Sequence, residues 1–149
     1  MIKGLLNQPK IWLELDECEL LFKKFHSFLD FDEPIPPFDT RFPGKLEAVL
    51  GAVCQTLDGK YLYSTIIDAL VAYLVMINRS HPFQNGNKRM SVLFSNVFLI
   101  QNGYDFTLTN DRMFNLAITI ATAGEWGIEN DVLKDFVRDY IKDKIKKLY

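Results

Sequence analysis

The residues from His81 to Arg89 place a candidate general base next to a candidate anion-binding backbone. His81 is one of only two histidines in the chain, and histidine is the side chain whose ordinary pKa best suits it to accept a proton near neutral pH. Gly86 permits backbone conformations that other residues avoid and lets a ligand approach the main chain closely. If a helix begins at Gly86 or Asn87, its first unpaired N–H groups attract anions. One loop would then hold both the base and the anion.

Positive charge is concentrated in the same loop. Lys88 and Arg89 would lie at the N-terminus of the following helix, which is the unfavourable end for cations if only helix stability matters. The chain as a whole is acidic, with a net charge of −2, yet no Asp or Glu occurs between Asp68 and Asp105. Positive charge at this position therefore favours a bound phosphate.

Each of these features has a structural explanation when it is taken alone. A single histidine at a helix end is often only a hydrogen-bonding residue, Asn-Gly is above all a turn signal, and a Lys-Arg pair after a turn is usually solvated. The other histidine, His26, lies beside Phe25 and Phe28, where the structural interpretation is the stronger one. The functional interpretation of His81 to Arg89 depends on the combination of features within one short segment.

Two amphipathic helices are expected in the first part of the chain. Both carry apolar residues at three- and four-residue steps, which is typical of a helix with one buried face. The Pro-rich run from Pro34 to Pro37 ends the first helix, and Asp58-Gly59 ends the second. The apolar positions are Leu15, Cys18, Leu21, Phe22, Phe25, Phe28 and Leu29 in the first helix, and Leu46, Val49, Leu50, Val53 and Leu57 in the second.

The third helix leads directly into the loop. Ser64 or Thr65 can cap its start, and residues 66–77 are apolar on almost every side, so this helix belongs in the middle of the fold. It must end near Ser80, because Pro82 disfavours helical geometry at the residue before it.

Three more helices are expected after the loop. The fourth starts at Gly86 or Asn87 and ends at Asn102-Gly103, and Thr109 caps the fifth. Between them, residues 104–108 form a short strand or an extended connector. Asn130 caps the sixth helix, which extends to Leu148. The last turns of this helix carry cations that complement the helix dipole, namely Lys142, Lys144, Lys146 and Lys147.

The predicted fold is one compact all-α domain covering residues 1–149, with about six helices and at most a short strand or hairpin. The longest apolar stretch, Ala69 to Ile77, is too short to cross a bilayer, and the N-terminus has no export signal, so we expect a cytoplasmic protein without membrane contact. The charge balance argues against DNA as a partner. Cys18 and Cys54 lack the spacing of a metal site, and we expect both to be buried, reduced thiols.

The segment from His81 to Arg89 resembles the Fic/Doc motif His-Pro-Phe-x-(Asp/Glu)-Gly-Asn-(Gly/Lys)-Arg at every fixed position except one. The resemblance extends to Pro43–Leu50, which is similar to a Pro-Gly-x-Leu-(Glu/Asp) helix start of Doc-like proteins, and to the helical pair within residues 117–140. It covers roughly residues 40 to 140 and leaves the first helix as a generic one. The resemblance implies a compact helical Fic/Doc domain that transfers AMP or a phosphoryl group from a nucleotide to a protein hydroxyl.

The resemblance also implies a role for each residue of the motif. His81 would deprotonate a Ser, Thr or Tyr hydroxyl of a target protein, and Phe83 would anchor the loop in the core. Lys88 and Arg89 would stabilise charge in the transition state, and Lys88 is the Doc-like choice, which favours phosphoryl transfer. The expected contacts to ATP or another nucleotide come from Phe83, Gly86, Asn87, Lys88 and Arg89. The loop from Phe38 to Phe42 lies where the family has a flap that positions the target.

Asn85 is the departure from the motif, because it stands where the family has an Asp or Glu that binds Mg²⁺. An amide oxygen can coordinate this ion but lacks the charge that makes a carboxylate a good ligand. Three outcomes follow: an enzyme with weak or relaxed metal dependence, an active enzyme whose metal is held mainly by nucleotide phosphates, or a relative that only binds. The alternative to a transferase is therefore a nucleotide-binding module.

The resemblance also suggests a partner. Many Fic proteins carry an inhibitory (Ser/Thr)-x-x-x-Glu-(Gly/Asn) motif, but the glutamate here that precedes Asn130 is Glu129, and the residue four positions before it is Glu125. We therefore expect restraint to come from a separate antitoxin, as in a toxin–antitoxin pair. The oligomeric state has no signal in the sequence.

Overall fold

The computed structural model describes residues 1–25 and 35–149. The described residues form six α-helices with two short antiparallel strand pairs, so the predicted helical fold is confirmed. The elements are the 3-10 helix η1 (Lys3–Leu6), α1 (Leu15–Phe25), the 3-10 helix η3 (Phe38–Thr40), α2 (Lys45–Val53), β1 (Thr56–Leu57), β2 (Lys60–Tyr61), α3 (Ile66–Ser80), α4 (Asn87–Gln101), β3 (Tyr104–Phe106), α5 (Asn110–Glu125), α6 (Asn130–Ile141) and β4 (Ile145–Lys147).

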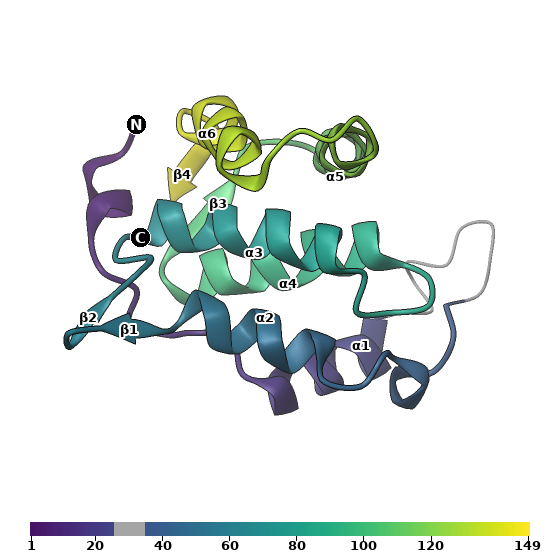
Figure 1. Cartoon of the computed structure of the whole chain (residues 1–149). Helices are drawn as coiled ribbons and strands as arrows, with labels where there is room; N and C mark the ends of the chain where they lie inside the picture. The colour runs from purple at the N-terminus through teal and green to yellow at the C-terminus, as the bar shows by residue number, and fades with distance from the viewer. Residues whose placement is uncertain (26–34) are drawn as a thin grey trace.

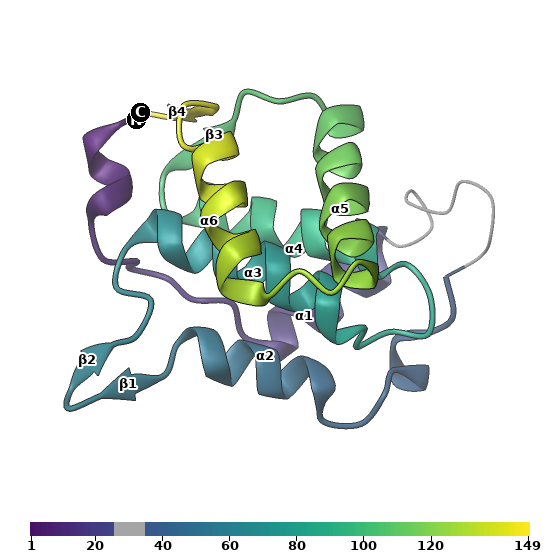
Figure 2. The same cartoon turned by 45° about the horizontal axis from the view of Figure 1, so that its top comes forward.

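The central helix of the fold is α3. It packs along α4 and also contacts α2, α5 and α6. Figures 1 and 2 show the pair α3–α4 as a middle layer, with α1 and α2 on one side and α5 and α6 on the other. Eleven of the residues of α3 are buried, which agrees with the expectation that a helix without a polar face lies in the middle. The loop that follows α3 therefore starts from a helix that is fixed in the core.

The N-termini of α3 and α5 lie at the residues that the sequence predicts as caps. Thr65, one of the two residues expected to cap α3, accepts a hydrogen bond from the Asp68 N–H at 3.2 Å. Thr109 caps α5 in the same way, accepting from the Arg112 N–H at 3.3 Å. The N-cap of α6 is Glu129, whereas Asn130, the expected cap, is the first residue of the helix.

The second helix is shorter than predicted. It ends at Val53, whereas Leu57 lies in β1, which pairs with β2. Asp58 and Gly59 both have positive φ, 53° and 77°, as a two-residue hairpin turn requires. The expectation of a helix through Leu57 was wrong because Asp-Gly is a hairpin signal before it is a helix stop.

The last helix is also shorter than predicted. It ends at Ile141, and the following residues turn back so that Ile145 pairs with Phe106 and β4 lies antiparallel to β3. The strand is favoured over a longer helix because it buries Ile145 and supplies hydrogen-bond partners to the backbone of β3. The expected cluster of lysines in the last helical turns is therefore divided: Lys142 caps α6 and Lys144 bonds the Tyr140 carbonyl, while Lys146 and Lys147 lie in β4.

Other expectations concern the first helix, the cysteines and the membrane. Phe28, Leu29, Pro34 and His26 lie outside the described residues, so the end of the first helix is not tested. Both cysteines are free, Cys18 buried and Cys54 partly exposed. Within the described ranges, no helix has the length and apolar character needed to cross a membrane.

Candidate active site

The loop between α3 and α4 begins and ends with left-handed backbone. His81 closes α3 with φ 49° and ψ 59°, and Gly86 precedes α4 with φ 81°. A residue with a side chain pays about 1–3 kcal/mol for such a conformation and keeps it only where its surroundings impose it. Here the following Pro82 is buried and its carbonyl accepts a hydrogen bond from the Phe42 N–H at 2.9 Å. The strained His81 is thus fixed between a rigid helix and a buried proline.

Phe83 anchors the loop in the core. Its side chain is buried, and its ring centroid lies 5.2 Å from that of Phe22, 6.0 Å from Phe38 and 6.2 Å from Phe94. These three partners come from α1, η3 and α4, so one ring joins three elements. Phe83 is not among the residues that line the pocket described below. Its buried ring positions the loop, and the expected contact between Phe83 and a nucleotide stays a prediction.

Gly86 allows the loop to pass close to the core. A Cβ atom at this position would lie 2.8 Å from Cδ1 and 3.0 Å from Cγ1 of the buried Ile35. Glycine is therefore required twice, for its positive φ and for this approach.

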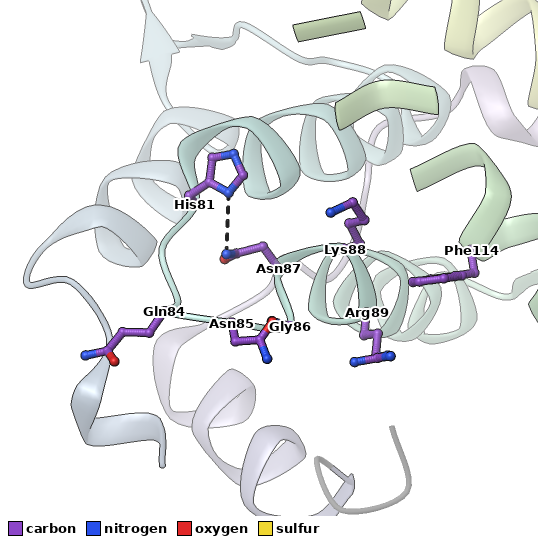
Figure 3. Close-up of a pocket in the computed structure, with 8 residues that line it drawn as sticks. All are labelled: His81, Gln84, Asn85, Gly86, Asn87, Lys88, Arg89 and Phe114. Atoms are coloured by element: carbon purple, nitrogen blue, oxygen red, sulfur yellow. Dashed lines mark hydrogen bonds between the residues drawn. The ribbon is translucent and has the colours of Figure 1, made fainter. Parts of the chain in front are cut away.

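Asn87 bonds the loop to itself. Its Oδ1 accepts a hydrogen bond from the Phe83 N–H at 2.9 Å, and its Nδ2 donates to the Phe83 carbonyl at 2.8 Å. The same Nδ2 lies 3.5 Å from Nδ1 of His81. Figure 3 shows the His81 ring turned toward the Asn87 side chain, with Lys88 and Arg89 beyond it on the first turn of α4. Both polar atoms of the Asn87 side chain are thus engaged within the loop, and the expected phosphate contact of Asn87 stays a prediction.

A pocket opens over the start of α4. Its volume is about 320 Å³, which lies at the lower end of the range of about 300–1,000 Å³ for small-molecule sites. It brings together six of the seven residues that the sequence singles out as site residues, all except Phe83. The lining residues are His81, Gln84, Asn85, Gly86, Asn87, Lys88, Arg89 and Phe114 (Figure 3).

Sequence reasoning missed two of these residues. Phe114 reaches the pocket from α5, and the Arg89 guanidinium carbon lies 5.6 Å from its ring centroid. The sequence does contain a signal for Phe114: it is a large aromatic residue that lies off the buried face of α5, which Met113, Leu116 and Ile120 form. Gln84 was the unspecified position of the motif; its Nε2 donates to the Thr40 carbonyl at 2.9 Å.

The segment from Phe38 to Phe42 lies directly against the motif loop. Besides the Gln84–Thr40 bond, the Phe42 N–H bonds the Pro82 carbonyl. Arg41 braces the segment from the other side through an ion pair with Glu47 at 3.4 Å. This is the place expected for a flap; that it positions a target stays a prediction.

The residues present do not fit a protein-bound magnesium ion. The Asn85 Oδ1 accepts a hydrogen bond from the neighbouring Gly86 N–H at 2.8 Å, and none of the described residues that line the pocket is a carboxylate. Across residues 1–25 and 35–149, no group of three or more His, Cys, Asp or Glu side chains could hold a metal. The charged groups in the pocket lining, Lys88 and Arg89, are instead suited to an anion.

The comparison with known families agrees with this geometry. A family model described as the Fic/DOC family matches residues 16–99, and the chain belongs to that family. The match includes α1, which the sequence left as a generic helix, and stops at the end of α4, so the likeness of residues 117–140 to Doc proteins stays a prediction. No curated protein matches the chain.

Proposed function

We propose that this protein transfers AMP or a phosphoryl group from ATP to a Ser, Thr or Tyr hydroxyl of a target protein. The observation that carries the proposal is the position of His81, whose Nδ1 lies 3.5 Å from Asn87, the first residue of α4. A candidate base therefore lies next to the N-terminus of α4, and a helix N-terminus attracts anions. Lys88 and Arg89 line the same pocket.

The residues would divide the chemistry in a simple way. The unpaired N–H groups of the first turn of α4 hold nucleotide phosphates, and Lys88 and Arg89 stabilise the charge that grows on the phosphoryl oxygens. The target hydroxyl attacks phosphorus, its proton passes to His81, and a new O–P bond forms. Attack at the α-phosphorus releases pyrophosphate and leaves AMP on the target; attack at the γ-phosphorus releases ADP and leaves a phosphoryl group.

Labelled nucleotides distinguish the two reactions. The protein is incubated with a cell lysate and either α-labelled or γ-labelled ATP. Label on a target from the α-position alone means AMP transfer, and label from the γ-position alone means phosphoryl transfer. His81→Ala should abolish either signal, whereas Lys146→Ala, a change of an exposed cation on β4, should not. Equal labelling by His81→Ala would overturn the proposal.

A second candidate function is nucleotide binding without transfer, and Asn85 favours it. Because no carboxylate lines the pocket among residues 1–25 and 35–149, Mg²⁺ at this site would depend mainly on the nucleotide phosphates. Calorimetric titration with ATP separates the two: binding that Lys88→Ala weakens, together with no label on any target, supports the binding module.

We further propose that the protein acts in the cytoplasm as a toxin that a separate antitoxin restrains. The support is the family together with the absence of the inhibitory motif around Glu125 and Glu129. Expression of the chain alone should slow cell growth, and expression of His81→Ala should not. Equal growth of the two strains at equal protein levels would contradict this role.

A further inference from the structure

The amide of Asn87 has one orientation that satisfies the loop. Its oxygen must face the Phe83 N–H, which needs an acceptor, and its nitrogen must face the Phe83 carbonyl, which needs a donor; the two distances are 2.9 and 2.8 Å. A flipped amide would set donor against donor and acceptor against acceptor. Because Asn87 is 9% exposed, water has little room to compensate for such a flip. The Nδ2 group is thereby fixed on the side of His81.

The Nδ2 group of Asn87 also lies close to the His81 ring. With one hydrogen used by the Phe83 carbonyl, the other is directed to the space that contains Nδ1, 3.5 Å away. A neutral imidazole has one N–H and one lone pair, and an N–H at Nδ1 would oppose the hydrogen of Asn87. The lone pair is therefore favoured at Nδ1 and the proton at Nε2. His81 is an exposed residue, so solvent can hydrogen-bond an Nε2–H.

We propose that Asn87 is a positioning residue that sets the tautomer of His81, with the lone pair on Nδ1 and the proton on Nε2. In terms of the proposed function, on which this consequence rests, Nδ1 is then the atom that accepts the proton from the target hydroxyl. The O–H electron pair forms the bond to phosphorus, the proton moves to Nδ1, and the ring becomes an imidazolium. Nδ1 also faces the start of α4, where the phosphate is expected, so base and phosphorus lie on the same side of the ring.

The length of the contact fits this role. At 3.5 Å the Asn87–His81 contact is longer than an ordinary hydrogen bond of about 2.7–3.2 Å. It is close enough to disfavour a proton on Nδ1 but weak enough for a substrate hydroxyl to replace it. A residue that only tied the loop together would need the two Phe83 bonds and no contact with His81.

The tautomer can be measured directly, without nucleotide or target. In ¹⁵N-labelled protein, long-range ¹H–¹⁵N correlation spectra distinguish the two neutral tautomers by the shifts of the ring nitrogens and by their couplings to the ring protons. Spectra are recorded above the pH at which the ring is protonated, and His26→Gln identifies the signals of His81. We expect the Nε2–H tautomer in the wild type, without the averaged shifts of an unconstrained ring.

Two variants of equal charge test the cause. Asn87→Asp keeps the acceptor for the Phe83 N–H and replaces the donor that faces His81 by an acceptor, so the majority tautomer should change to Nδ1–H. Asn85→Asp is the control: Asn85 bonds the Gly86 N–H and has no contact with His81 among the described residues, so the tautomer should stay Nε2–H.

The outcomes are decisive even if one variant fails to fold. Averaged or Nδ1–H signals in the wild type overturn the proposal, as does a folded Asn87→Asp protein that keeps the Nε2–H tautomer. If Asn87→Asp does not fold, the wild-type spectrum alone decides. A protein that shows the expected tautomers but labels no target would keep this inference and lose the proposed transferase function.

Discussion

The amide of Asn85 carries no charge at the one position where the family motif has a carboxylate. In the structure its oxygen is used by the Gly86 N–H, so it forms part of the turn that starts α4. Replacing it by a carboxylate would keep that bond, since a carboxylate oxygen also accepts. The site can therefore be tested for a missing metal ligand without disturbing the loop.

Asn85→Asp should raise the affinity for Mg²⁺ in the presence of ATP by about tenfold or more, because even residues that merely support a metal ligand change affinity by about 10–100-fold. Transfer activity at limiting Mg²⁺ should rise with it. Metal titrations of activity measure the effect, and Asn130→Asp, which adds the same charge at the start of α6, is the control. Unchanged or reduced activity at low Mg²⁺ would show that the missing carboxylate does not limit turnover.

Gly86 and Gly44 offer a comparison between strain alone and strain with a clash. Both have positive φ, 81° and 77°, but a Cβ at Gly44 would meet nothing within 4 Å, whereas one at Gly86 would meet Ile35 at 2.8 Å. Gly44→Ala should lower the free energy of unfolding by about 1 kcal/mol, and Gly86→Ala by about 2–4 kcal/mol, since overpacking adds to the strain. Urea denaturation measures both. Equal losses would mean that Ile35 moves aside at no cost.

At the scale of elements, the aromatic contacts of Phe83 connect the loop between α3 and α4 to the rest of the fold. Phe83→Ala should lower the free energy of unfolding by about 3–5 kcal/mol, as expected for a buried phenylalanine. Phe136→Ala removes an aromatic side chain that is 50% exposed on α6 and should cost much less. Denaturation curves of both variants measure the difference. A loss at Phe83 no larger than that at Phe136 would contradict the anchoring role.

The elements that were predicted well are those with local signals. Thr65 and Thr109 bond backbone within three residues of themselves, so a cap and an apolar period were enough to place α3 and α5. The pairing of Ile145 with Phe106 depends on a segment almost forty residues away, and nothing within the last twenty residues opposes a longer helix. Distance along the chain, more than residue type, separates what could be predicted from what could not.

The candidate site shows the same division. The sequence could group the site residues that lie within one short segment, and the pocket does bring them together, namely His81, Gly86, Lys88 and Arg89. Phe114 joins from α5 because α4 and α5 pack, which no local pattern encodes. The inward direction of the Asn87 side chain also follows from the folded loop and not from residue type.

At the scale of the whole molecule, the positive charges around the central helices have separate uses. Arg79, at the end of α3, donates to the Ile128 carbonyl at 2.9 Å and so joins α3 to the connection between α5 and α6. Lys88 and Arg89 line the pocket instead. The acid-free stretch from residue 69 to residue 104 thus supplies both a structural contact and the positive charge of the proposed phosphate site.

The buried thiol of Cys18 makes the stability of the whole fold depend on alkaline pH. Burial, and next the nearby Glu17 carboxylate, raise the pKa of this thiol from 9.0 to about 12. Between these values the unfolded chain has lost a proton that the folded chain retains, so the free energy of unfolding falls as pH rises, by at most about 1.4 kcal/mol per pH unit from this group. Burial also raises the pKa of Tyr73, which adds to the loss at higher pH.

Cys18→Ala should therefore flatten the pH dependence even though it lowers stability at neutral pH by opening a small cavity. Urea denaturation at pH 8, 9 and 10 compares the slopes, and we expect the wild type to lose about 1–2 kcal/mol more than Cys18→Ala over this range. Cys54→Ala, which leaves Cys18 in place, should retain most of that loss. Parallel slopes for the wild type and Cys18→Ala would contradict this prediction, because they would mean that the buried Cys18 thiol ionises equally well in the folded and unfolded chains.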